Sequence, residues 1–216
     1  MHFNIGAALM GVFAMLSSCG LAADSAVWQD PETGFTFSQY AAAFDIGKTV
    51  TFRIAIPSTA TASAPYDAVL QIVSPIAVGW TGVAWGGTMV TNPLTVGWAN
   101  GNTAVATARW ATGHTAPSVY SGATLQNLKT GTHSNSTHWQ VTFKCTGCTS
   151  FASSSGNKTL TPTGSNRLAF AYSKSKPTTP SSGSSTFPVH DVTNYWNHDF
   201  ASAANSDFAA LVTKNS

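Results

Sequence analysis

The sequence contains very little charge. Only 8% of its 216 residues are Asp, Glu, Lys or Arg, and the formal net charge is +2, whereas soluble domains usually carry about 25% charged residues. The Lys and Arg residues form no dense patch of the kind that nucleic acid binding requires. The charge is too sparse for a coiled coil, and a hydrophobic content of 43% is too high for a charged disordered chain. The length predicts one domain rather than a multidomain enzyme.

Residues that carry hydrolytic chemistry are equally scarce. Glu32 is the only glutamate, and no two aspartates stand out as a glycosidase pair. There is no Gly-x-Ser-x-Gly segment, which the nucleophile elbow of a serine hydrolase needs. The histidines show neither His-x-His nor His-Glu-x-x-His spacing. The sequence therefore gives no support for a hydrolase or for a dedicated zinc or copper site.

No apolar run is long enough for a membrane-spanning helix, which takes roughly 20 residues. Residues 4–16 form a shorter apolar run, and a stretch of small residues follows it and ends at Ala23. This order is typical of a secretory signal peptide. We therefore expect residues 1–23 to be a signal peptide and residues 24–216 to be one mature domain. The protein is expected to be secreted and extracellular, without a membrane anchor.

Cysteine is scarce, and Cys19 lies within the expected signal peptide, which leaves Cys145 and Cys148. Their Cys-Thr-Gly-Cys segment lacks the second pair that a zinc site needs and the following histidine that covalent c-type haem attachment needs. It also lacks the βαβ context of a thioredoxin-like motif. A local disulfide at the end of a strand is expected instead. Asn135 and Asn157 begin N-glycosylation sequons, which a eukaryotic secretory route can use.

The mature chain consists of short β-rich runs separated by Gly, Pro, Asn and Ser. Their spacing predicts an all-β fold, an immunoglobulin-like antiparallel β-sandwich, rather than alternating strands and helices. Helical periodicity is confined to residues 199–212, which predicts a short C-terminal helix. Residues 173–186 are rich in Pro and Ser and predict a flexible loop. The predicted strands cover residues 49–56, 68–73, 94–99, 103–110, 138–144 and 167–172.

Methionine is scarce as well, because Met89 is the only one in residues 24–216. It follows Trp80, Trp85 and the pair Gly86 and Gly87. Adjacent glycines adopt backbone angles that other residues avoid, so this segment predicts a tight loop that presents Met89. Taken alone, a single methionine more often packs in a core, and the tryptophans beside it would also be core residues by default.

Several of these segments together resemble a known family. Residues 79–101, GWTGVAWGGTMVTNPLTVGWANG, resemble the haem-binding segment of the cytochrome domain of fungal cellobiose dehydrogenases. That domain is DOMON-like and also occurs as a stand-alone secreted cytochrome. Residues 33–37, 74–75, 109–113 and 138–148 resemble further motifs of the family, in the same order. The resemblance covers essentially the whole mature chain.

The resemblance implies one non-covalent b-type haem, held between a methionine and a histidine. Met89 stands at the family's methionine position and His190 at its histidine position, as the axial ligands of the haem iron. His198 is the competing histidine, but the downstream aromatic and acidic residues match the family's offsets from His190. The resemblance also makes His114 and Trp85 candidate haem contacts. His114 replaces the family's usual tyrosine near a haem propionate, and Trp85 is bulkier than the aliphatic residue expected there.

The resemblance also implies a function. Ligation by methionine and histidine fills both axial positions, so it suits electron transfer rather than oxygen chemistry, and the thioether raises the reduction potential. We expect a secreted b-type cytochrome that takes single electrons from an extracellular dehydrogenase or another reductant. Its expected acceptors are copper polysaccharide monooxygenases or ferric complexes, in fungal lignocellulose degradation.

Other properties follow as expectations. The sequence shows no flavin fingerprint and ends soon after the domain, so the electron donor is expected to be a separate molecule. Ferric-reductase-type activity is compatible with this function, whereas no dehydrogenase or hydrolytic site is found. The protein is expected to be a monomer. The alternative function is that of a haem-free DOMON-like module that binds a carbohydrate or another ligand.

Overall fold

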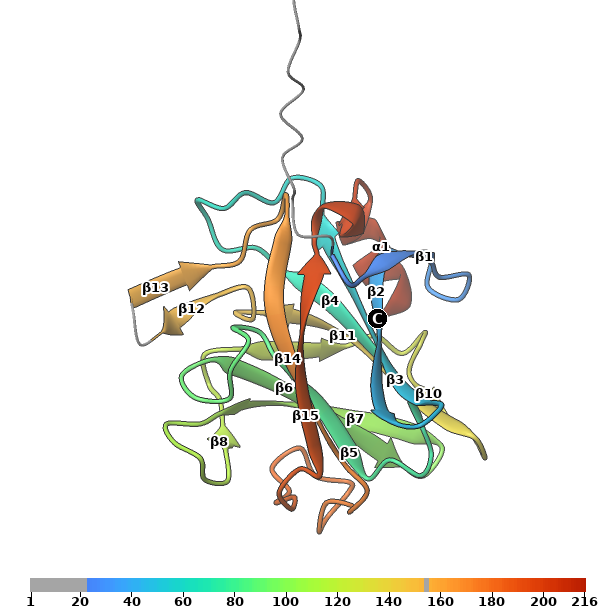
Figure 1. Cartoon of the computed structure of the whole chain (residues 1–216). Helices are drawn as coiled ribbons and strands as arrows, with labels where there is room; N and C mark the ends of the chain where they lie inside the picture. The colour runs from blue at the N-terminus through green and yellow to red at the C-terminus, as the bar shows by residue number, and fades with distance from the viewer. Residues whose placement is uncertain (1–22, 154–155) are drawn as a thin grey trace, which may run out of the picture.

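The computed structural model describes residues 23–153 and 156–216 (Figure 1). The signal peptide expected over residues 1–23 lies, except for Ala23, outside the described residues. Within those residues, most strands form two sheets that pack face to face, and the single α-helix lies at the C-terminal end. No helix of the described ranges is long and apolar enough to cross a membrane. The all-β sandwich predicted from the strand spacing is confirmed.

The first sheet has the strand order β1-β2-β3-β4-β11-β10, and β9 and β16 pair with β11 and β3. Its members are β1 (Ala26–Gln29), β2 (Thr36–Asp45), β3 (Lys48–Pro57), β4 (Ala68–Pro75), β9 (Thr124–Asn127), β10 (His133–Ser134), β11 (His138–Thr146) and β16 (Ala204–Asn205). Neighbouring strands are antiparallel, except that β16 runs parallel to β3.

The second sheet has the strand order β15-β14-β5-β6-β7-β8 and is antiparallel throughout. Its members are β5 (Trp80–Ala84), β6 (Pro93–Asn100), β7 (Thr103–Trp110), β8 (Ser118–Val119), β14 (Ser165–Ser173) and β15 (Val192–Asp199). A separate hairpin pairs β12 (Ser150–Ser153) with β13 (Gly156–Thr159).

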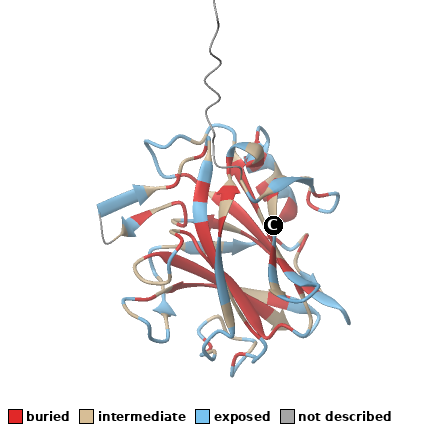
Figure 2. Cartoon of the chain, viewed as in Figure 1, coloured by how far each residue is buried: buried red, intermediate tan, exposed pale blue. Residues whose placement is uncertain are grey.

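The core lies between the two sheets, where the central strands are buried (Figure 2). Alternate residues of a strand point to opposite faces, so Phe52 and Ile54 of β3 join the core while Arg53 points outward. Trp196 of β15 stacks on Tyr40 and Phe52, with ring centroids 4.8 and 5.5 Å away. These contacts bind the two sheets together across the sandwich.

The C-terminal helix is shorter and begins later than the sequence predicts. Residues 199–212 were expected to be helical, but Asp199 ends β15, a 3-10 turn spans Ala201–Ala203 and the helix α1 spans Phe208–Asn215. The interruption has a local cause. The Asn205 amide accepts a hydrogen bond from the Thr36 backbone N–H (2.9 Å) and donates one to the Thr36 carbonyl (2.8 Å), which holds Asn205 in a strand.

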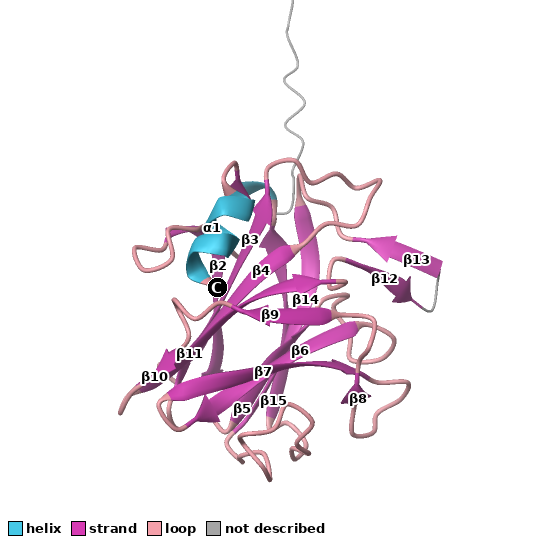
Figure 3. Cartoon of the chain, turned by 180° about the vertical axis from the view of Figure 1, so that it is seen from behind, coloured by secondary structure: helices cyan, strands magenta, loops and turns pink. Residues whose placement is uncertain are grey.

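The helix α1 covers part of the outer face of the first sheet (Figure 3). Its Phe208 and Val212 are buried against Phe35 and Phe37, and the rings of Phe35 and Phe208 are 5.8 Å apart. The Asn215 amide at the end of the helix donates hydrogen bonds to the carbonyls of Thr33 and Leu211. These contacts form a second apolar cluster that is separate from the main core.

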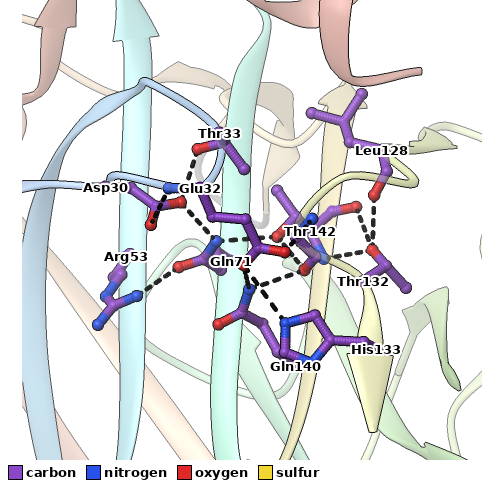
Figure 4. A network of polar contacts seen from close by, with 11 residues as sticks. Asp30, Glu32, Thr33, Arg53, Gln71, Leu128, Thr132, His133, Gln140 and Thr142 are labelled. Atoms are coloured by element: carbon purple, nitrogen blue, oxygen red, sulfur yellow. Dashed lines mark hydrogen bonds and ion pairs between the residues drawn. The ribbon is translucent and has the colours of Figure 1, made fainter. Parts of the chain in front are cut away.

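A polar network also lies on that outer face (Figure 4). The buried Gln71 amide donates to a carboxylate oxygen of Asp30 (3.1 Å) and to the Thr142 hydroxyl (3.0 Å), and its oxygen accepts from Arg53 (2.6 Å). Glu32 closes the other end of the network by pairing with His133 at 3.3 Å. Because the Gln71 amide is fully engaged, we interpret the network as a structural link between β3, β4 and β11.

The expected disulfide is present, since Cys145 and Cys148 are joined. Both residues are completely buried at the end of β11. Gly147 between them has φ +89°, and a Cβ at this position would overlap the backbone of Gly122. Only glycine fits there, because the turn needs both a positive φ and this close approach.

Candidate functional site

The outer face of the second sheet carries two apolar clusters that are separate from the core. In the first cluster, half-buried Met89 packs against Ala84, Leu94, Ala111 and Ala169. The residues of the second cluster are Trp80, Val96 and Trp98, together with the partly buried Val105, Ala171 and Phe187. Since Val83 belongs to the main core, its neighbour Ala84 faces away from it, and so does Met89.

Between these clusters the sheet face is built from very small residues. In the register of β14 with β5, Ala169 lies opposite Ala84 and Ala171 lies opposite Gly82. We call these four residues the small-residue floor. None of them carries more than a methyl group, so a flat group can approach this part of the sheet closely. Larger side chains border the floor, from Leu94 and Val96 of β6 and from Thr193 and Tyr195 of β15.

The loop that carries Met89 follows β5 and is held by its own hydrogen bonds. The Asn92 amide donates to the Thr88 hydroxyl (2.6 Å) and to the Val90 carbonyl (2.9 Å). The Thr91 N–H donates to the Ala111 carbonyl (2.9 Å), which ties the loop to the end of β7. Gly87 has φ +82°, as the prediction of a tight glycine-dependent loop requires. The loop therefore presents Met89 in a defined place.

Replacing Gly86 by alanine is expected to damage this loop. A Cβ on Gly86 would overlap the Asn92 amide, so the bonds that close the loop would break. We expect the free energy of unfolding to fall by about 1–3 kcal/mol, measured by urea denaturation. Gly113→Ala is the matched control, because a Cβ there would meet no atom within 4 Å and should change stability by less than about 0.5 kcal/mol. Equal effects of the two substitutions would refute this account.

The segment between β14 and β15 carries His190 and lies at the lower end of the second sheet in Figure 1. The sequence predicts a flexible loop over residues 173–186, but this part of the chain is bonded to the sheet. The indole N–H of Trp98 donates to the Pro180 carbonyl (2.8 Å), and that of Trp80 donates to the Pro188 carbonyl (3.1 Å). Proline and serine content indicated an irregular segment correctly, but it did not indicate that the segment is anchored.

The imidazole of His190 is exposed and makes no hydrogen bond or ion pair to another described residue. It stands just before β15, whose first residues border the small-residue floor. Met89 and His190 thus belong to the two loops that flank one sheet face. A thioether and a neutral imidazole are both ligands that haem iron accepts.

His198 has a different environment. Its ring is completely buried in the sandwich, where Nδ1 accepts a hydrogen bond from the indole N–H of Trp196 (2.8 Å). Burial is the main cause that lowers the pKa of this imidazole to about 3, while the Ser38 backbone and the Asp199 charge oppose the shift only partly. The neutral ring packs edge-on against Trp196 and Phe200. His198 therefore lies in the core and not on the face that carries Met89.

The other two residues named from the sequence lie apart. His114 is exposed in the loop after β7, three positions beyond Ala111, which packs against Met89. Trp85 is completely buried in the main core, where its indole N–H donates to the Thr95 hydroxyl (3.2 Å). His114 is thus close along the chain to a member of the Met89 cluster, whereas Trp85 has a packing role on the opposite side of the sheet.

The remaining candidate positions lie at the surface. Asn135 and Asn157 are both exposed, and Asn157 belongs to the outer hairpin strand β13. The Asn135 side chain accepts hydrogen bonds from the Thr137 backbone and hydroxyl and from the His138 backbone. Within the described ranges, no group of three or more His, Cys, Asp or Glu residues is arranged to hold a metal ion.

Comparisons with known proteins agree with one another. Residues 28–210 match the family described as the cytochrome domain of cellobiose dehydrogenase. Curated pyrroloquinoline quinone-dependent pyranose dehydrogenases of Coprinopsis cinerea are 32% identical over 178 residues, which make up 82% of this chain but 24% of theirs. The chain thus spans about a quarter of the length of these relatives.

Solved structures give the same answer. The cytochrome b domain of the Coprinopsis cinerea pyranose dehydrogenase is 30% identical, with a TM-score of 0.76 over 90% of this chain and 96% of that one. The cytochrome domain of Myriococcum thermophilum cellobiose dehydrogenase is 23% identical, with a TM-score of 0.79 over 90% and 98% of the two chains, and shares the fold.

Proposed function

Because the chain belongs to the family of cellobiose dehydrogenase cytochrome domains, we propose that it is a secreted b-type cytochrome that carries single electrons, with one non-covalent haem b held between Met89 and His190. One observation carries this assignment of the ligands. A thioether and a free imidazole lie in the two loops that flank the same flat sheet face.

The residues present fit a haem. The small-residue floor offers a flat apolar surface, and the Met89 and Phe187 clusters supply apolar side chains at both of its ends. The cysteines are already joined to each other, which agrees with a haem that is not covalently attached. His198 is excluded from this face by its burial, so His190 is the histidine that fits.

A haem iron held by Met89 and His190 would supply reversible one-electron chemistry. Met89 contributes a thioether, which favours the ferrous form and raises the reduction potential. His190 contributes a neutral imidazole nitrogen from a loop that is bonded to the sheet. The apolar floor keeps water away from the site, and the stiff sandwich lets the ligands stay in place when the charge changes.

We also propose a role for His114, as a haem contact at the edge of the same site. Its exposed imidazole follows Ala111, which contacts Met89. A propionate near this loop would accept a hydrogen bond from an N–H of the ring.

The proposed donor is an extracellular dehydrogenase, and the proposed acceptors are copper polysaccharide monooxygenases or ferric complexes in lignocellulose degradation. The support is the family itself and the fact that the curated relatives are pyranose dehydrogenases, of which this chain matches about a quarter. Secretion through the signal peptide, glycosylation at Asn135 and Asn157 and a monomeric state belong to the same proposal.

Rapid mixing tests the electron-transfer function. The reduced protein, separated from excess reductant, is mixed with a cupric polysaccharide monooxygenase or with a ferric chelate, and the loss of the ferrous absorption bands is followed. We expect complete single-turnover oxidation, at a rate that rises with acceptor concentration. A redox-inactive zinc-substituted acceptor is the control. If the ferrous bands are lost no faster with any acceptor than by air oxidation alone, the result would contradict the proposed function.

A further inference from the structure

Residues 174–191, which we call the histidine loop, cross the outer face of the second sheet and are bonded to three successive strands. Donors from β5, β6 and β7 each reach carbonyl groups of the loop. Trp80 donates to Pro188 (3.1 Å), Trp98 to Pro180 (2.8 Å), and one Arg109 nitrogen to both Gly183 and Ser185 (2.7 Å each). The loop therefore has an anchor near its start, in its middle and next to His190.

Arg109 is an unusual anchor because it is a buried cation. Only 4% of its surface is exposed, and no carboxylate of a described residue forms an ion pair with it. Its guanidinium is satisfied by carbonyls and by the face of Phe187, whose ring centroid is 5.1 Å away. Burying a cation without a counter-ion is costly. The two shortest hydrogen bonds that offset this cost go to carbonyls of the histidine loop, while the Pro117 carbonyl (3.4 Å) and the Thr107 hydroxyl (3.3 Å) accept longer ones.

Phe187 connects these anchors to the ligand position. Its ring lies 4.8 Å from that of Trp80 and 6.2 Å from that of Trp98, and it precedes His190 by three residues. The start of the loop also packs closely against the sheet, because any Cβ on Gly79 would overlap the backbone of Ser175. The histidine loop is thus held by groups that belong to the sheet.

We propose that Arg109, Trp80 and Trp98 are positioning residues that hold the histidine loop in its binding conformation before the haem arrives. This inference rests on the proposed function, since it assigns His190 as a ligand. Ordering a long irregular loop on binding would weaken affinity, whereas a loop ordered during folding keeps that affinity. The anchors therefore set how tightly the haem is retained, while the ligands set its spectrum.

Two variants and a matched control test the proposal. Trp98→Phe and Arg109→Gln remove anchors of the histidine loop, and Trp98→Phe keeps a ring in place. Trp85→Phe is the control, because it removes an indole donor of the same sheet whose partner is Thr95 in the core. Amide hydrogen exchange is measured on the haem-free proteins, and the rate of haem transfer to excess apomyoglobin is measured on the loaded proteins.

Both anchor variants should accelerate exchange of the amides in residues 174–191 at least tenfold, while β3 amides keep their protection. They should also accelerate haem loss at least tenfold, equivalent to about 1.4 kcal/mol, with band positions unchanged because the ligands remain. Trp85→Phe should leave loop exchange unchanged. Loop exchange equal to that of the control, or equal acceleration in the loop and in β3, would overturn the proposal.

The exchange measurement also separates this proposal from the proposed function. If the wild-type protein binds no haem, the proposed function fails, yet exchange in the haem-free variants still decides whether the anchors order the loop. If haem binds and loop exchange does not respond, the cytochrome function stands and the positioning role is refuted.

Discussion

Replacing Met89 by alanine is expected to abolish the six-coordinate low-spin spectrum of the haem-loaded protein. Residues 24–216 contain no other methionine, so no second thioether can take its place. A methyl side chain cannot ligate iron, and an axial position left to water or left open gives a high-spin spectrum. The reduction potential should fall as well, because the thioether is the ligand that favours the ferrous form. Optical and electron paramagnetic resonance spectra measure both spin state and ligation.

The proposed imidazole ligand, His190, is tested by comparing its alanine variant with that of another exposed histidine. His190→Ala should remove the low-spin spectrum as completely as Met89→Ala does, because the second axial ligand is lost. His138→Ala is the matched control, since His138 is also exposed but lies on the first sheet. A low-spin spectrum that survives His190→Ala and disappears with a substitution at His114 would assign the ligand differently and refute the site described above.

Acid is expected to destabilise the fold through His198. The folded-state pKa of this imidazole is lowered from 6.5 to about 3, with burial as the main cause. Between these values the unfolded chain binds a proton that the folded chain does not. The free energy of unfolding therefore falls as pH falls, by at most about 1.4 kcal/mol per pH unit. Between pH 6.5 and pH 4.5 this group alone should remove roughly 2 kcal/mol of stability.

The measurement compares the wild-type protein with His198→Gln by urea denaturation at several pH values. Glutamine cannot titrate but can accept the hydrogen bond from Trp196. The Glu32–His133 pair is present in both proteins, so its contribution to stability cancels in the difference. The variant should lose less stability on acidification. An NMR titration of the His198 ring in the wild-type protein should show no protonation above about pH 4. Parallel stability curves, or titration near pH 6.5, would contradict this prediction.

Strands with strong alternation of β-branched and polar residues were predictable from the sequence. The predicted strand over residues 103–110 has the bounds of β7, and the prediction over residues 49–56 falls within β3. The strands β2, β5 and β15 were not predicted. β5 is short and lies among glycines. β15 is an edge strand in which only two of the eight residues are buried, so most of its side chains are polar. Local composition resembles a loop in these cases, and pairing with distant strands decides the structure.

The site was predicted only in part. Met89 and His190 were identified through a family resemblance, and the tight glycine loop through its two glycines. The small-residue floor depends on the register of β14 with β5, which no local pattern reveals. The sequence indicated Arg109 only as part of a motif, because its partners in the histidine loop lie more than 70 residues further along the chain. Trp85 was a candidate haem contact by sequence position, but its direction at the end of β5 places it in the core.

The central claim is that this sheet face holds a haem b between Met89 and His190. The most direct test is the visible absorption spectrum of the protein secreted by cells supplied with haem, recorded before and after addition of dithionite. The account predicts a Soret band that sharpens on reduction, with resolved α and β bands, as six-coordinate low-spin iron gives. A colourless protein would contradict it, and would favour a DOMON-like module that binds a carbohydrate or another ligand.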